Sequence, residues 1–166
     1  MDDLVPSETR RLSTSQRNLI RASFEFMRTE ANKNGLAIFV RLFAEFPQYK
    51  GIWPNFRAIP DSALISSDAL KNHGKVYMGA LAYIVASLDN DTKLGEALTK
   101  IAASHAKWGI KKFHLENMVP ELLETLNVCM GNTLDEETSH SWETLYDIIG
   151  NIIETQNKGK RSDRLL

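Results

Sequence analysis

Apolar residues recur along most of the chain at intervals of three and four, the spacing that places side chains on one face of an α-helix. Helices are expected at about residues 13–32, 36–46, 66–88, 92–107, 112–130 and 135–157. No alternating apolar run is long enough to demand a β-sheet, and the sequence contains no internal repeat. Because 166 residues is a usual size for one hydrophobic core, the sequence predicts a single all-α domain.

The boundaries of this domain are expected at residues 12 and 157. Residues 1–11 are interpreted as a polar N-terminal extension, and residues 158–166 as a short basic C-terminal tail. Inside the domain, Pro120 falls within the helix expected at 112–130. Proline lacks a backbone N–H and clashes with the preceding turn, so this helix should kink at Pro120 or begin near Val119.

Composition and charge argue against several classes of protein. Twenty Lys and Arg residues face 21 Asp and Glu residues, and the net charge of −1 gives no electrostatic reason to expect nucleic acid or an anionic membrane as a partner. No segment approaches the roughly 18 apolar residues of a transmembrane helix, and the N-terminus lacks the apolar run of a signal peptide. The single cysteine, Cys129, cannot form an intrachain disulfide, so we expect a reducing, cytoplasmic location.

Two histidines occupy positions where the apolar face of a helix calls for an aliphatic side chain. One face is formed by residues spaced 4, 3, 4 and 3 apart, namely Leu94, Leu98, Ile101, His105 and Trp108. The other is formed by residues spaced 3, 4, 4, 3 and 4 apart, namely Leu70, His73, Tyr77, Leu81, Ile84 and Leu88. Two long helices are therefore expected to direct an imidazole inward.

A single inward histidine is most simply a core residue that hydrogen-bonds a backbone carbonyl. Two of them, His73 and His105, favour a metal or cofactor held between their helices, because an imidazole buried without a partner costs on the order of 1–3 kcal/mol. Haem iron takes one or two axial imidazoles. Zinc fits less well, since a four-coordinate site needs further ligands and neither apolar face carries a cysteine or carboxylate.

The order and spacing of several motifs resemble the globin family across residues 12–157. They are Leu12-Ser13 with Phe24, Gly35 twelve residues before Pro47, Phe46-Pro47, Trp53 and Phe56, His73-Gly74, and Ser104-His105-Ala106, with 32 residues separating the two histidines. The resemblance implies a globin fold of about seven or eight helices around a pocket for haem b. Trp53, where globins usually carry phenylalanine, is similar to invertebrate globins, especially the neuronal globins of nematodes.

The resemblance also implies a role for individual residues. His105 corresponds to the proximal iron ligand and His73 to the distal histidine. Tyr77 stands where globins usually carry Val, Ile or Leu above the iron, and its hydroxyl is expected to face a bound ligand, a haem propionate or solvent. The remaining expected haem contacts are Phe39, Trp53 and Phe56 on the distal side and Ile101, Ile110 and Phe113 elsewhere in the pocket.

Three bulky pocket residues, Phe39, Trp53 and Tyr77, favour a six-coordinate haem with both histidines on the iron. Such a site suits redox signalling or electron transfer with a redox partner rather than oxygen storage.

The first alternative is reversible binding, transport or sensing of a diatomic gas, dioxygen or nitric oxide, with His73 and Tyr77 stabilising the ligand. The second is a haem enzyme such as a nitric oxide dioxygenase, nitrite reductase or peroxidase, which the missing reductase domain disfavours. A haem-free helical domain is the last alternative, and His105 argues against it. The sequence indicates no oligomeric state.

Overall fold

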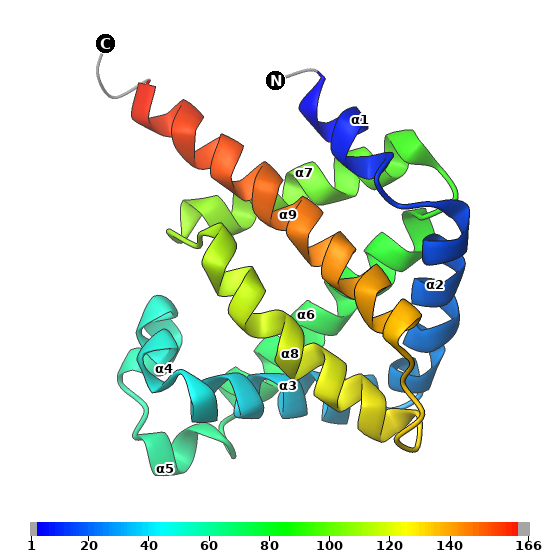
Figure 1. The fold of residues 1–166 in the computed structure, drawn as a ribbon. Helices are drawn as coiled ribbons and strands as arrows, with labels where there is room; N and C mark the ends of the chain where they lie inside the picture. Colours follow the sequence, from blue (N-terminus) through cyan, green and yellow to red (C-terminus); the bar gives the residue numbers. More distant parts are fainter. Residues whose placement is uncertain (1–2, 163–166) are drawn as a thin grey trace.

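Nine α-helices and one 3-10 helix account for most of residues 3–162, the part of the chain that the computed structural model describes (Figure 1). They are α1 (Leu4–Thr9), α2 (Thr14–Arg28), α3 (Ala31–Glu45), η1 (Pro47–Ile52), α4 (Pro54–Arg57), α5 (Asp61–Leu64), α6 (Asp68–Ser87), α7 (Asp91–Lys107), α8 (Lys112–Cys129) and α9 (Glu136–Ser162). This range contains no β-strand, which confirms the expected all-α fold. None of its helices combines the length and apolarity that crossing a membrane requires.

Side-chain caps set the starts of three long helices. Ser13 accepts a hydrogen bond from the Gln16 amide at 3.1 Å, and the Gln16 side chain accepts one from the Ser13 amide at 2.9 Å, so the two residues form a capping box. At the starts of α6 and α7, the side chains of Ser67 and Asn90 each accept a hydrogen bond from the backbone N–H three residues later. The helix α8 runs through Pro120 from Lys112, so the expectation that it could begin near Val119 is wrong.

The core is continuous from the first long helix to the last. The apolar face of α9 is buried, including Trp142, whose indole N–H donates to the Ser23 hydroxyl at 2.9 Å inside the core. A second group of buried side chains gathers around the short helices: Phe39, Leu42, Tyr49, Phe56, Leu64 and Leu70. This second group forms one side of the candidate site described below.

The helices α3 and α6 cross in backbone contact. A Cβ atom at Gly35 would lie 2.5 Å from the carbonyl oxygen of Gly74, and one at Gly74 would lie 3.0 Å from the carbonyl carbon of Gly35. Only glycine leaves room for such an approach. Because Phe39 lies one turn beyond Gly35 and His73 directly precedes Gly74, the crossing brings these two rings together.

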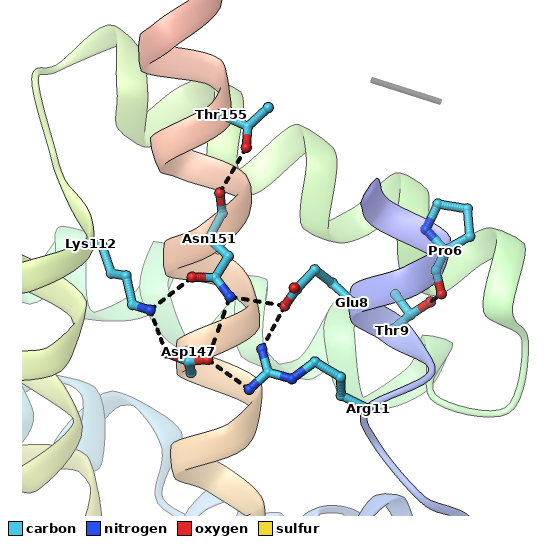
Figure 2. A network of polar contacts seen from close by, with 8 residues as sticks. All are labelled: Pro6, Glu8, Thr9, Arg11, Lys112, Asp147, Asn151 and Thr155. Carbon is cyan, nitrogen blue, oxygen red and sulfur yellow. Dashed lines mark hydrogen bonds and ion pairs between the residues drawn. The ribbon is translucent and has the colours of Figure 1, made fainter. Parts of the chain in front are cut away.

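A helix that the sequence analysis did not predict, α1, lies within residues 1–11 and packs against α7 and α9. Figure 2 shows the polar network that ties it down: Glu8 accepts from Arg11 and Asn151, and Arg11 also pairs with Asp147 at 2.7 Å. Lys112 pairs with the other oxygen of Asp147 at 2.6 Å. The network therefore joins α1, α9 and the first turn of α8.

Helix α9 also anchors the loop between α7 and α8. Asn157 on α9 donates to the carbonyl of Ile110 at 3.1 Å, two residues before Lys112. The helix α9 continues beyond the expected end at residue 157 to Ser162, and residues 163–166 of the expected basic tail lie outside the described range. The hydrogen bond from Asn157 and the network around Asp147 thus both position the chain that follows His105.

The glycine crossing predicts opposite effects for two alanine substitutions. Gly35→Ala forces backbone or Met78 to move and should lower the free energy of unfolding by about 1–3 kcal/mol. Gly79→Ala, on the exposed side of α6 with no atom within 4 Å, should raise it by up to about 1 kcal/mol through helix propensity. Urea unfolding followed by circular dichroism measures both. Equal effects of the two changes would contradict a close crossing at Gly35.

Candidate functional site

A cavity of about 380 Å³ opens between α6 and α7 and is closed by α3, η1 and α8. Its walls are mostly aromatic and aliphatic. The lining residues are Phe39, Leu42, Tyr49, Ile52, Trp53, His73, Val76, Tyr77, Ala80, Ile101, Ser104, His105, Trp108, Ile110, His114, Leu115 and Met118. Both histidines singled out from the sequence therefore border the same cavity, one from each flanking helix.

The orientation of His105 is fixed by the helix that carries it. Its Nδ1 lies 2.7 Å from the carbonyl oxygen of Ile101, one turn earlier in α7. A carbonyl only accepts, so Nδ1 carries the proton and Nε2 keeps a lone pair. Burial lowers the pKa of His105, although the Ile101 carbonyl opposes this shift. His105 is thus a neutral imidazole with one nitrogen free to bind a metal.

His73 lies on the opposite wall inside a group of aromatic rings. The ring centroids of Phe39, Trp53 and Phe56 lie 4.7, 5.1 and 5.8 Å from that of His73, all in edge-to-face arrangements. Burial, with a smaller contribution from His105, lowers the pKa of His73 to about 4. This imidazole is therefore also neutral near pH 7.

The two imidazoles suit a planar metal cofactor better than a bare ion. Among the described side chains, residues 3–159, every side-chain nitrogen or oxygen that is shut off from solvent has a hydrogen-bond partner, so the unpartnered nitrogens of His73 and His105 are not sealed in the core. No group of three His, Cys, Asp or Glu side chains within this range could hold a metal ion. Two imidazole nitrogens between apolar walls would suit an iron that already has its other ligands from a porphyrin.

Tyr77 contributes its ring to the cavity and its hydroxyl to a different partner. The ring packs edge-on against Phe39, with centroids 5.3 Å apart, while the hydroxyl forms a short hydrogen bond with the hydroxyl of Tyr146 on α9. Burial raises the pKa of both phenols, so both stay protonated. The hydroxyl occupies none of the three environments expected from the sequence, because α9 offers it a buried partner.

The other expected haem contacts divide into two groups. Phe39, Trp53, Ile101 and Ile110 line the cavity. Phe56 is buried behind it, against Trp53 and His73. Phe113 lies outside the lining, 48% exposed and stacked on His114, and its contact with haem stays a prediction from the family resemblance.

Several lining residues were missed by the sequence analysis. His114 lies on no apolar stripe that would predict an inward position, yet it is partly buried, borders the cavity and accepts a hydrogen bond from the Lys111 amide at 2.9 Å. Tyr49 borders the cavity while its hydroxyl accepts from Asn117 at 2.7 Å. Leu115 and Met118 lie three residues apart on one face of α8, and this spacing could have predicted that both side chains point inward. No spacing rule reaches Tyr49, because it lies in the short 3-10 helix.

Comparison with known proteins gives a consistent result. A family model described as Globin matches residues 36–153. Cytoglobin-1 of Oryzias latipes is 28% identical over 143 residues, which cover 85% of this chain and 81% of the relative. A double mutant of the myoglobin of Aplysia limacina shares the fold with a TM-score of 0.80 and 21% identity, covering 87% of this chain and 97% of that one. A hexa-coordinate haemoglobin of Drosophila melanogaster gives a TM-score of 0.75 at 25% identity, covering 86% and 93%.

The Tyr77–Tyr146 hydrogen bond predicts a strong coupling between the two positions. Tyr146→Phe leaves the buried Tyr77 hydroxyl without its partner and should cost about 1–3 kcal/mol of unfolding free energy. The double variant Tyr77→Phe/Tyr146→Phe removes both polar groups and should recover most of that loss. Urea unfolding of the two single variants and the double variant measures the coupling. Purely additive losses would show that the hydroxyls do not interact.

Proposed function

Because the chain belongs to the globin family, we propose that it binds haem b in the cavity between α6 and α7, with His105 as the proximal iron ligand. The observation that carries this proposal is the hydrogen bond from His105 Nδ1 to Ile101, which leaves Nε2 free beside an apolar cavity. Bound there, haem would supply an iron that changes oxidation state and takes up small ligands. His105 would hold the iron, and the Ile101 carbonyl would keep the ring in its binding tautomer.

The remaining residues would orient the cofactor and exclude water. Phe39, Trp53 and Phe56 form the distal wall together with His73, and Tyr77 closes it toward α9. The proximal contacts are proposed for Ile101 and Ile110, with Phe113 added from the family resemblance. Apolar walls of this kind leave the two imidazoles as the main polar groups at the centre of the site.

We propose further that His73 is the second axial ligand, which makes the iron six-coordinate. In the described range His73 has no hydrogen-bond partner, and its low pKa leaves one ring nitrogen unprotonated, with its lone pair available. Phe39, Trp53 and Tyr77 crowd the space beside it. A bound His73 that is favoured by about 3 kcal/mol would weaken gas binding about a hundredfold, while leaving electron transfer free of ligand exchange. The proposed role is therefore redox signalling or electron transfer.

Reversible binding of dioxygen or nitric oxide is the second candidate. It is favoured by the position of His73, which could donate to an iron-bound ligand instead of binding the iron itself. In this alternative His73 would stabilise the ligand without Tyr77, because the Tyr77 hydroxyl is hydrogen-bonded to Tyr146. A cytoplasmic location, the absence of enzymatic turnover and the particular likeness to nematode neuronal globins remain predictions from the sequence.

Substitution of His73 separates the two candidates. The reduced, ligand-free protein should show the sharp, split visible bands of a low-spin six-coordinate iron, and His73→Ala should convert them to one broad band. Carbon monoxide should then bind up to about a hundredfold faster, because no internal ligand competes. His140→Ala, on the exposed start of α9, serves as the control and should change neither measurement. A broad band in the unsubstituted protein would refute six-coordination.

Substitution of His105 tests haem binding itself. His105→Ala removes the proximal ligand and should abolish tight retention, measured as the rate of haem transfer to an excess of apomyoglobin. The expected increase is at least about a hundredfold, corresponding to the loss of roughly 3 kcal/mol of binding free energy. The His140→Ala protein again serves as the control. Unchanged retention in His105→Ala would contradict the assignment of this histidine.

A further inference from the structure

Charges are unevenly distributed on this protein although their sum is almost zero. Residues 97–115 contain four lysines and no acidic residue, and residues 69–88 contain two lysines and no acidic residue. Residues 116–137 contain six acidic residues and neither Lys nor Arg. In the fold, the first two segments flank the cavity, whereas α8 carries the third away from them to the start of α9 (Figure 1).

The lysines near the cavity are available to an external partner. Lys75 on α6, Lys107 on α7 and Lys111 in the following loop are exposed. Among the described side chains, residues 3–159, none of the three forms an ion pair, whereas the neighbouring Lys112 is bound to Asp147. The two carboxylates of α9 beside this region, Asp147 and Glu154, are both bound to Lys112. Exposed lysines without an ion pair create a local positive potential.

Large apolar side chains lie exposed between these lysines. Val76 is 68% exposed and Trp108 is 57% exposed, and both also line the cavity, so they form its mouth. Each directly follows a lysine in the sequence. An exposed tryptophan surrounded by charges of one sign is typical of a protein-binding surface, where aromatic residues provide affinity and the surrounding charges provide steering.

We propose that this cationic mouth, formed by Lys75, Val76, Lys107, Trp108 and Lys111, docks an electron-transfer protein whose own surface is acidic around its cofactor. The proposal rests on the proposed redox function and names the class of its partner. A symmetric dimer through this mouth fits less well, because it would bring lysines against lysines. An anionic membrane fits less well too, since the protein has a net charge of −1.

The positions of the lysines allow a matched control. Lys93 and Lys107 are both exposed on α7 and 14 residues apart, which places them on the same face of the helix about 21 Å from each other. Lys93→Glu and Lys107→Glu therefore change the net charge equally and differ in their distance from the mouth. The triple variant Lys75→Glu/Lys107→Glu/Lys111→Glu enlarges the local effect.

The experiment is a stopped-flow reduction of the ferric haem-loaded protein by reduced flavodoxin, an acidic flavin protein used as the probe. One electron passes from the flavin to the iron, so the flavin is oxidised by one electron and the iron is reduced by one. At low ionic strength Lys107→Glu should slow the second-order rate about threefold and the triple variant about tenfold or more, with both effects lost at high salt. Lys93→Glu should change the rate by less than about twofold.

Several results would overturn the proposal. Equal slowing by Lys93→Glu and Lys107→Glu would mean that only net charge matters, and unchanged rates in the triple variant would exclude docking at the mouth. Faster haem loss with an unchanged salt dependence would show that the lysines serve the haem carboxylates instead. Tighter binding to phosphatidylserine vesicles than to flavodoxin would assign the surface to a membrane. The proposed six-coordinate function is tested separately, and a single broad visible band of the reduced protein would refute it. The rates with flavodoxin test docking at the mouth whether the iron is five- or six-coordinate.

Discussion

The contact between Gly35 and Gly74 determines the geometry of the distal half of the site. At this crossing the backbones of α3 and α6 touch, and the neighbouring side chains have no freedom to separate. Phe39 is therefore held against His73, with their ring centroids 4.7 Å apart, and Trp53 and Phe56 complete the group from the short helices. A wider crossing would leave the imidazole on α6 without the aromatic rings that desolvate it.

The proximal half of the site depends on hydrogen bonds rather than on close packing. His105 is oriented by the carbonyl of Ile101 in its own helix, and the chain that follows it is fixed by Asn157 and by the network around Asp147. One histidine is thus held by ring contacts and the other by a specific backbone bond. If both histidines bind iron as proposed, this difference would make His105 the permanent ligand and His73 the replaceable one.

The sequence predicted the features that depend on local periodicity. The long helices and the shared cavity of His73 and His105 both follow from spacings along the chain. The partner of Tyr77 could not be predicted in this way, because it depends on how α9 crosses α6. The exposure of Phe113 and the burial of His114 likewise depend on the start and rotation of α8. The net charge of −1 does not reveal that basic and acidic residues are concentrated in different segments, because it is a sum over the whole chain.

The network between α1 and α9 has a consequence for the order in which the protein can be made. Glu8 and Asn151 lie 143 residues apart in the sequence, and the core bond between Ser23 and Trp142 spans 119 residues. A ribosome produces α9 after all the other elements, so Trp142, Tyr146 and the anchor of the α7–α8 loop are the last parts to emerge. The residues that line the cavity all precede Val119, and α9 adds the groups that brace them, the Tyr146 hydroxyl and the Asn157 side chain. The walls of the cavity are therefore synthesised before the helix that supports them from behind.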